Sequence, residues 1–374
     1  MLRYGESYFY YICDYQLPIA ASILTFISYS VKTFSNQRAM MIKPSNSNFN
    51  VHPTFNSAKQ SAQMEFHAIA PMYIAYGTIF LVSLFGNSFI IHIIRTDKSM
   101  KTAINYLISN QASVDILITF IYLMDTVRVN SYQGWWFGGN MGNFTCKLCH
   151  ASFYFLPSFS LFLLVAIAVD RFYAVTRPFD RTPISRHVKK VILTLWIFSL
   201  ILSALVFANG HLETKKESYL CHTHIPLKYF NGKELNVISL TLAVVIPMTL
   251  LAVLYTKICI KLWSRQAPGE GASQNQRQLQ VIVTAKKVTR MMIAIVVLFV
   301  ICWVPFYVIM ALLHLGFVQN KAVRFSVWLS VSFSGINPYV YFAFSAYFRD
   351  GLKHLFGNIH IFPPRSERIE LQQI

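Results

Sequence analysis

Long apolar runs dominate the hydrophobic pattern of the chain. Runs without charged residues cover 74–94, 148–169, 191–208, 235–256, 291–313 and 325–348. A helix that crosses a membrane needs about 20 apolar residues, because lipid offers its backbone no other hydrogen-bond partner. A further run, from Ala103 to Met124, is interrupted only by Asp115. We therefore predict an all-α membrane protein with a bundle of seven crossing helices.

Composition supports this class, since 55% of the 374 residues are hydrophobic and only 13% are charged. Lys and Arg collect on the cytoplasmic side of a membrane protein. With the N-terminus outside, 20 of the 33 Lys and Arg residues fall in inner segments and 13 in outer ones. The net charge of +18 is thus mostly a topology signal. No dedicated basic domain supports nucleic-acid binding.

The pattern divides the chain into four parts. Residues 1–65 form an extracellular N-terminal segment expected to be largely disordered, and 66–345 form the seven-helix domain. Within the first part, 7–31 read either as a signal peptide or as tail, and 44–63 as a flexible linker. Residues 346–357 predict an amphipathic eighth helix on the inner leaflet, because apolar and basic residues occupy opposite sides. Residues 358–374 form a short cytoplasmic tail.

Two cysteines lie on the predicted outer side. Cys146 begins the third helix and Cys221 lies in the loop between the fourth and fifth, so an oxidising compartment could join them. Cys149 is an alternative partner, but it lies one turn deeper in the apolar run. Asn143 heads the sequon Asn143-Phe144-Thr145, a candidate glycosylation site whose closeness to the membrane could block the transferase.

Asp115 is an ionisable residue inside a membrane span, which by default marks function. The polar residues that could converge on it are Asn87, Ser160, Ser334 and Asn337. A carboxylate among neutral oxygens suits a small hard cation such as sodium. The alternative is a protonated Asp115 that only specifies helix packing.

Prolines recur in the middle of the predicted helices. They are Pro157, Pro247, Pro305 and Pro338. Each removes a backbone hydrogen bond and bends its helix, which membrane proteins tolerate where neighbours fill the gap. Kinks in the fifth, sixth and seventh helices suit a bundle that switches between two arrangements.

These features occur together in an order that resembles the rhodopsin-like G-protein-coupled receptors, over about residues 66–357. The residues that carry the resemblance are Gly86-Asn87, Asn110, Asp115, Asp170-Arg171-Phe172, Trp196, Pro247, Tyr255, Phe299, Cys302-Trp303-Val304-Pro305 and Asn337-Pro338-Tyr339-Val340-Tyr341. Their order, their helices and the outer cysteine pair make a chance match implausible.

The resemblance implies a set of roles. It implies a Cys146–Cys221 disulfide, a sodium site around Asp115, Trp303 as a switch at the pocket floor, and a G-protein cleft at the inner face. The activation residues that it implies are Asp170, Arg171, Pro247, Tyr255, Phe299, Trp303, Pro305, Pro338 and Tyr341. Arg171 would contact the G protein, and Phe179 in the second inner loop offers it an apolar contact.

The chain also departs from the family pattern. Phe172 stands where a Tyr is usual, Gln111 where a Leu is usual, and Ala285 where some members carry an acid that pairs with Arg171. The tail offers one phosphorylation site, so an arrestin would use the third inner loop, with Ser264, Ser273 and Thr284.

Two residues that other receptor classes need are missing, which narrows the class of ligand. Phe153 replaces the Asp of amine receptors, and Val331 replaces the lysine of opsins. The outer loop His211–Glu234 predicts a β-hairpin, as in peptide receptors, and the sixth helix looks most like neuropeptide receptors. The pocket residues expected are Asp125, Arg128, Phe153, Tyr154, Phe306, Tyr307, Met310 and Trp328.

Simpler interpretations stand beside this one. Asp125 and Arg128 could form a private ion pair, and the aromatic residues could only pack the core. We expect a multi-pass plasma-membrane receptor, not an enzyme, with an extracellular peptide ligand, a heterotrimeric G protein and membrane lipid as partners and no cofactor beyond the sodium ion. The alternatives are a small-molecule or lipid ligand and, from another class, a secondary transporter, although we find no internal repeat.

Overall fold

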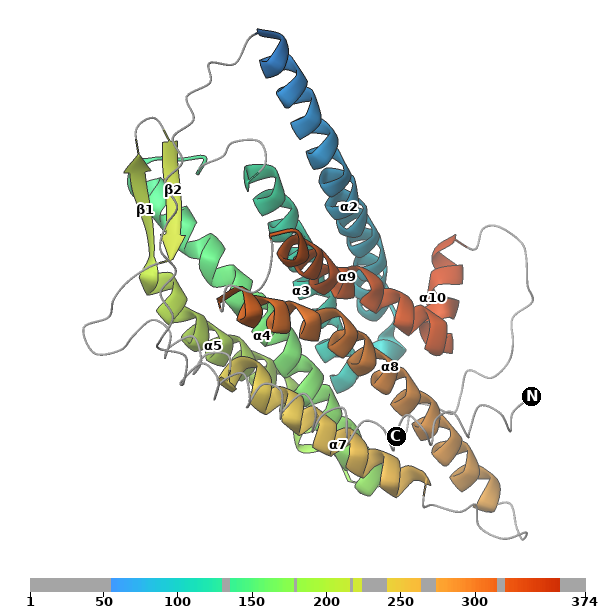
Figure 1. Cartoon of the computed structure of the whole chain (residues 1–374). Coiled ribbons are helices and arrows are strands. Elements are labelled where there is room, and N and C mark those ends of the chain that lie inside the picture. Colours follow the sequence, from blue (N-terminus) through green and yellow to red (C-terminus); the bar gives the residue numbers. More distant parts are fainter. Residues whose placement is uncertain are drawn as a thin grey trace.

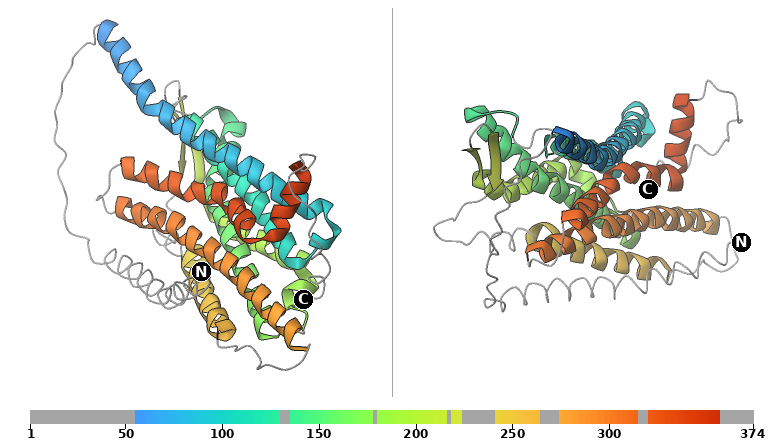
Figure 2. Two further views of the ribbon diagram at one scale, coloured as in Figure 1. Left: turned by 90° about the vertical axis from the view of Figure 1, so that its right-hand side faces the viewer. Right: turned by 45° about the horizontal axis from the view of Figure 1, so that its top comes forward.

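A computed structural model of the chain describes residues 55–129, 135–177, 180–215, 218–223, 241–263, 274–314 and 320–356. The helices are α2 (Phe55–Thr96), α3 (Ala103–Val127), α4 (Gly139–Thr176), α5 (Pro183–Asn209), α7 (Ile246–Trp263), α8 (Gln274–His314), α9 (Asn320–Phe344) and α10 (Ala346–Phe356). The strands are β1 (Gly210–Lys215) and β2 (Ser218–Thr223). The long helices form one bundle, with the hairpin at one end and α10 turned away from α9 (Figures 1 and 2).

Six helices of the described part are long and apolar enough to cross a membrane, namely α2, α3, α4, α5, α7 and α8. The seventh, α9, has 25 residues but carries four serines on its buried side, Ser326, Ser330, Ser332 and Ser334. From the sequence alone, the run that contains Asp115 is the least clear span. By apolar content the least clear span is α9, because its polar residues face the bundle and not lipid.

Several helices extend beyond the charge-free runs that predicted them. The helix α2 begins at Phe55 and so includes residues 55–65 of the segment expected to be disordered. That stretch is rich in Ala, Gln, Met and Glu, which favour helix, and its first proline is Pro71. The helix α8 begins at Gln274, well inside the third inner loop. Residues 1–54 and 357–374, with the signal-peptide and tail predictions, lie outside the described residues.

The helices of the bundle pack directly against one another, with one very close approach and one local distortion. The helix α4 packs against α3, α5 and α7, and α9 packs against α2 and α8. At Gly86 of α2, a Cβ atom would lie 2.6 Å from Cγ of Pro338 on α9. Only glycine therefore allows this approach. On the other side of the bundle, the π-helical turn Thr241–Val245 precedes Pro247, and such turns accommodate local breaks in helical hydrogen bonding.

The hairpin lies over the outer end of α4. Its strands are antiparallel, with Leu212 opposite Cys221. Cys146 and Cys221 form a disulfide, as predicted, and Cys149 is free. The backbone N–H of Trp135 donates to the carbonyl of Tyr219, 2.6 Å away. The hairpin is thus fixed both to α4 and to the segment that precedes it.

Candidate functional site

Asp115 lies fully buried in the centre of the bundle, with no accessible surface. The hydroxyl of Ser334 donates to its Oδ1 at 2.8 Å, and Nδ2 of Asn337 donates to its Oδ2 at 2.8 Å. Both donors come from α9, so the carboxylate joins α3 to α9. None of the ion pairs among the described residues includes Asp115. Hydrogen-bond donors alone therefore compensate its burial.

Gln111 is the third donor to Asp115, although from the sequence it stands out only as a departure from the family pattern. It lies one turn earlier on α3, and its Nε2 is 3.2 Å from Oδ1 of Asp115. The same Nε2 is 2.6 Å from Oγ of Ser160 on α4. Gln111 thus links two of the predicted cluster residues, while Asn87 donates instead to the carbonyl of Ser334 at 3.1 Å.

The resemblance implies a sodium ion at this cluster. A hard cation is bound by oxygen lone pairs, so its ligands must turn acceptors toward it. The amides of Asn337 and Gln111 instead turn N–H donors toward Asp115. The amide of Gln111 also fills the space between Asp115 and Ser160. The side chains as they lie do not fit a cation.

A column of aromatic rings lies on the outer side of this cluster. Trp303 of α8 is 1% exposed and stacks on Phe299, with ring centroids 5.8 Å apart. Phe299 meets the edge of Phe333 on α9 at 5.2 Å. Phe333 directly precedes Ser334, which donates to Asp115. Contacts therefore run without a gap from Trp303 to the buried carboxylate.

Above Trp303 lie several predicted pocket residues. Its ring contacts Phe306 and Tyr307, whose centroids are 5.9 and 6.0 Å away. Phe153 of α4 meets Tyr122 of α3 at 4.8 Å. Tyr154, Met310 and Trp328 are at least partly accessible. Phe153, Phe306, Tyr307 and Trp328 also pack against the core, so the packing and pocket interpretations both fit these four.

Asp125 and Arg128 form the private ion pair that the sequence suggested as the alternative, with an N–O distance of 2.6 Å. The guanidinium of Arg128 also lies 5.1 Å from the ring centroid of Trp135. The side chains of Arg128 and Asp125 remain 17% and 25% exposed. A ligand can therefore still reach this pair.

At the inner end of α4, Arg171 pairs with its neighbour Asp170, Nη2 to Oδ2, at 2.6 Å. Asp170 is 2% exposed, and its other oxygen accepts a hydrogen bond from the hydroxyl of Thr182. The sequence of α8 contains no Asp or Glu, so it offers Arg171 no acidic partner. The contact that holds Arg171 is therefore local to α4 and the start of α5.

Sequence reasoning missed Thr182. The only signal was its place before Pro183, since Thr at an N-cap followed by Pro is a common helix start. The hydroxyl of Thr182 does cap α5, accepting the N–H of Ser185 at 2.9 Å. Its bond to Asp170 depends on how the second inner loop folds back, which the sequence does not show.

Two tyrosines of the predicted set, Tyr255 on α7 and Tyr341 on α9, are buried at 2% exposure each. Tyr341 contacts Phe348 of α10, with ring centroids 5.7 Å apart. Phe348 is buried and faces the bundle, so only part of the apolar side of α10 is left for lipid. Phe179 lies outside the described residues.

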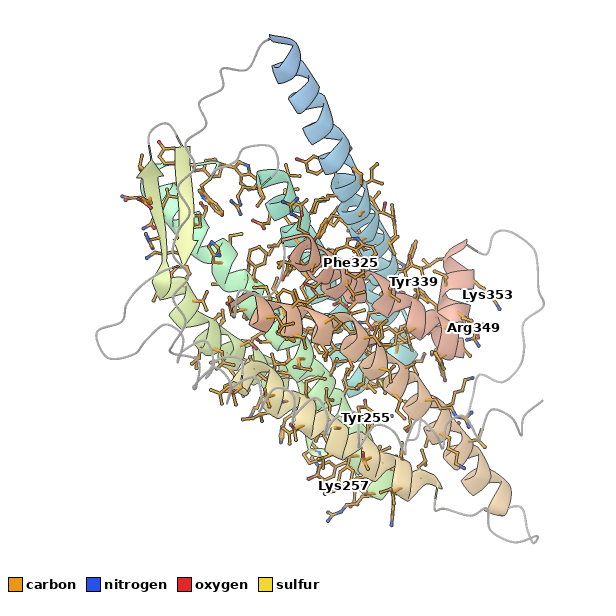
Figure 3. All side chains as sticks on the ribbon, viewed as in Figure 1. Tyr255, Lys257, Phe325, Tyr339, Arg349 and Lys353 are labelled. Atoms are coloured by element: carbon orange, nitrogen blue, oxygen red, sulfur yellow. A yellow bond between two sulfur atoms is a disulfide. The ribbon has the colours of Figure 1, made fainter. Side chains whose placement is uncertain are left out.

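The helix α10 is anchored to the inner end of α9. Arg349 donates to the carbonyls of Phe342 and Ala343 at 3.2 and 2.8 Å, satisfying groups that the end of α9 leaves unpaired. Figure 3 shows Arg349 and Lys353 on α10, apart from Tyr255 and Lys257 on α7. Burial, with a smaller effect of Asp97, raises the pKa of Tyr347.

Asn143 lies near the start of α4, where its Oδ1 accepts the backbone N–H of Leu212 at 3.2 Å. Thr145 of the same sequon accepts a hydrogen bond from Nε1 of Trp135 at 2.9 Å. The two side chains therefore connect α4 to β1 and to Trp135. Glycosylation of Asn143 stays a prediction.

The comparisons with known proteins agree with this geometry. A family model described as 7 transmembrane receptor (rhodopsin family) matches residues 86–341. The chain belongs to this family. It is therefore a multi-pass plasma-membrane receptor and not an enzyme, which removes the transporter alternative.

Similar proteins include neuropeptide receptors. The chain is 28% identical to the rat neuromedin-K receptor, over 77% of this chain and 64% of that protein. It is also 28% identical to the human neuromedin-K receptor, over 81% of this chain and 65% of that protein. For the substance-P receptor of Aquarana catesbeiana the identity is 28%, over 77% of this chain and 71% of that protein. The chain thus spans less than two thirds of the neuromedin-K receptors.

Proposed function

We propose that this receptor binds an extracellular ligand in the pocket above Trp303 and then activates a heterotrimeric G protein at its inner face. The observation that carries the proposal is the unbroken series of contacts from Trp303 through Phe299 and Phe333 to Ser334 and Asp115. A ligand can shift a two-state protein only through contacts that differ between the states. Contact with Trp303 would supply such a difference.

We propose a short peptide as the ligand. Aromatic rings, a partly exposed Asp125–Arg128 pair and a hairpin fixed across the outer end of α4 suit the polar and apolar groups of a peptide end. The similar receptors from rat and from Aquarana catesbeiana are named for neuromedin-K and substance P. A small molecule or a lipid is the alternative ligand.

The inner residues give the proposed mechanism. Trp303 lies two residues before Pro305, so its displacement would bend α8 at a point that already lacks a backbone hydrogen bond. In the active arrangement α8 would move away from the inner face and Arg171 would leave Asp170, with Tyr255 and Tyr341 rearranging around it. Arg171, and Phe179 beyond the described residues, would then contact the G protein.

The test uses cells that express the full chain and a sensor of G-protein dissociation. A peptide library is compared with panels of lipids and amines. We expect activation by a peptide and loss of activation in Arg171→Ala at measurable surface expression. Normal signalling by Arg171→Ala would refute the mechanism, whereas activation only by a lipid or an amine would refute the peptide ligand and leave the mechanism intact.

We propose two further partners. Arrestin would bind the third inner loop after phosphorylation; of its candidate sites, Thr284 lies in α8 and is partly buried, while Ser264 and Ser273 lie outside the described residues. Inner-leaflet lipid would contact α10, where Leu355 is 41% exposed and Lys353 is exposed beside it. Labelling of phosphosites after stimulation would test the first.

A further inference from the structure

The side-chain amide of Gln111 lies between two oxygens of the buried cluster. Its Nε2 lies between Oδ1 of Asp115, at 3.2 Å, and Oγ of Ser160, at 2.6 Å. These oxygens come from α3 and α4, and both belong to the cluster that the resemblance assigns to sodium. Gln111 is itself fully buried.

The orientation of the Gln111 amide follows from its two neighbours, which both present oxygen atoms to it. With Nε2 inward, the amide donates one N–H to Asp115 and the other to Ser160. With the amide reversed, Oε1 would face a carboxylate oxygen at the same short distance, and two acceptors would repel. The donor orientation leaves Oε1 without a hydrogen bond among the described residues. The donation to Asp115 outweighs that loss because a bond to a charged group is the stronger one.

We propose that the amide of Gln111 replaces the sodium ion in this receptor. The N–H groups of Gln111, Asn337 and the hydroxyl of Ser334 together supply the positive ends of three dipoles to the Asp115 carboxylate. The cluster is then held together by fixed side chains of α3, α4 and α9. Its stability does not vary with sodium concentration, and the inactive arrangement needs no bound ion.

The test compares the purified full-length receptor in sodium chloride and in choline chloride of equal ionic strength. The readout is the thermal unfolding midpoint, followed by tryptophan fluorescence, so neither a ligand nor a G protein is needed. We expect no difference between the two salts for the wild type. In Gln111→Leu, which removes the amide and opens the space between Asp115 and Ser160, sodium should raise the midpoint by about 3 °C or more.

The matched control is Gln111→Leu combined with Asp115→Asn, which removes the carboxylate and should abolish the sodium effect. Gln111→Ala opens the same space and replaces Gln111→Leu if that variant yields no folded receptor. A higher midpoint of the wild type in sodium would overturn the proposal. So would equal midpoints in the two salts for both Gln111 variants, because Gln111 would then not be what excludes the ion. Neither outcome depends on the ligand or the G protein proposed above.

Discussion

Thr182 binds Asp170 from the first turn of α5 while Asp170 pairs with Arg171. Removing one hydrogen bond to a buried charged group weakens the resting arrangement by about 1.5–3 kcal/mol, a factor of about ten or more. We therefore expect Thr182→Ala to raise ligand-free nucleotide exchange by about tenfold or more. The measurement is basal GTP-analogue binding in membranes, corrected for surface expression.

Two variants control this experiment. Thr182→Ser keeps the hydroxyl and should behave as the wild type. Thr176→Ala removes a hydroxyl that donates only within its own helix, to the carbonyls of Phe172 and Tyr173, and should leave basal exchange unchanged. If Thr182→Ala and Thr176→Ala give the same basal exchange, Thr182 does not restrain Arg171.

Single residues were predictable where the chemistry is unusual for its surroundings. Asp115 stands out because a charge inside a membrane span is costly, and Ser334 and Asn337 do converge on it. Gln111 was harder to place, because a neutral amide in a helix has many uses and only the packing of α3 against α4 gives it two partners. For Thr182 the sequence indicated only a helix cap, because its hydrogen bond to Asp170 depends on how the second inner loop folds.

At the scale of helices, the crossing of α2 and α9 depends on Gly86. A Cβ atom there would lie 2.6 Å from Cγ and 3.2 Å from Cβ of Pro338, whose ring cannot rotate away. We expect Gly86→Ala to cost about 1–3 kcal/mol, as overpacking does, and to lower the unfolding midpoint by about 3 °C or more. Thermal unfolding of the purified receptor measures this.

Gly77 provides a control on the same helix. Nothing lies within 4 Å of a Cβ atom added at Gly77. Because alanine is the better helix former, Gly77→Ala should leave the midpoint equal or slightly higher. A similar fall in both variants would mean that helix propensity or membrane insertion, and not contact with Pro338, controls stability.

The helices themselves were predictable from apolar runs, but their ends were not. The length of an apolar run reflects the thickness of the bilayer. The helices α2 and α8 continue beyond their apolar runs because the adjoining residues are good helix formers. The apolar run 325–348 located α9, but the hydropathy of α9 is low for a membrane span because the helix contains several buried serines. Its serines satisfy themselves by hydrogen bonds to carbonyls of the previous turn, as Ser330 does with Val327 and Ser332 with Trp328.

At the scale of the whole molecule, one central helix connects the outer and inner faces. The helix α4 carries Cys146 at its outer part, Ser160 at the buried cluster and the Asp170–Arg171 pair at its inner end. It is long, 38 residues, and packs mainly against α3, α5 and α7. Such a helix can stay fixed while α8 moves. From the sequence, this central place of α4 could be expected only through the family resemblance.

The disulfide fixes the hairpin to α4, and its loss should lower the stability of the whole fold. Cys146 and Cys221 are separated by 75 residues. In the chain-entropy account a crosslink of this span contributes up to about 4 kcal/mol by restricting the unfolded chain. We expect Cys146→Ser combined with Cys221→Ser to lower the unfolding midpoint by up to about 10 °C.

Reducing agent gives the decisive comparison. It should lower the midpoint of the wild type and of Cys149→Ser, whose thiol is free, but not that of the double variant, which has no crosslink to lose. All scans are run at one heating rate, since unfolding of such a protein need not be reversible. If Cys149→Ser loses its sensitivity to reduction, the outer crosslink joins Cys149 and not Cys146, and the hairpin would then be attached one turn deeper on α4.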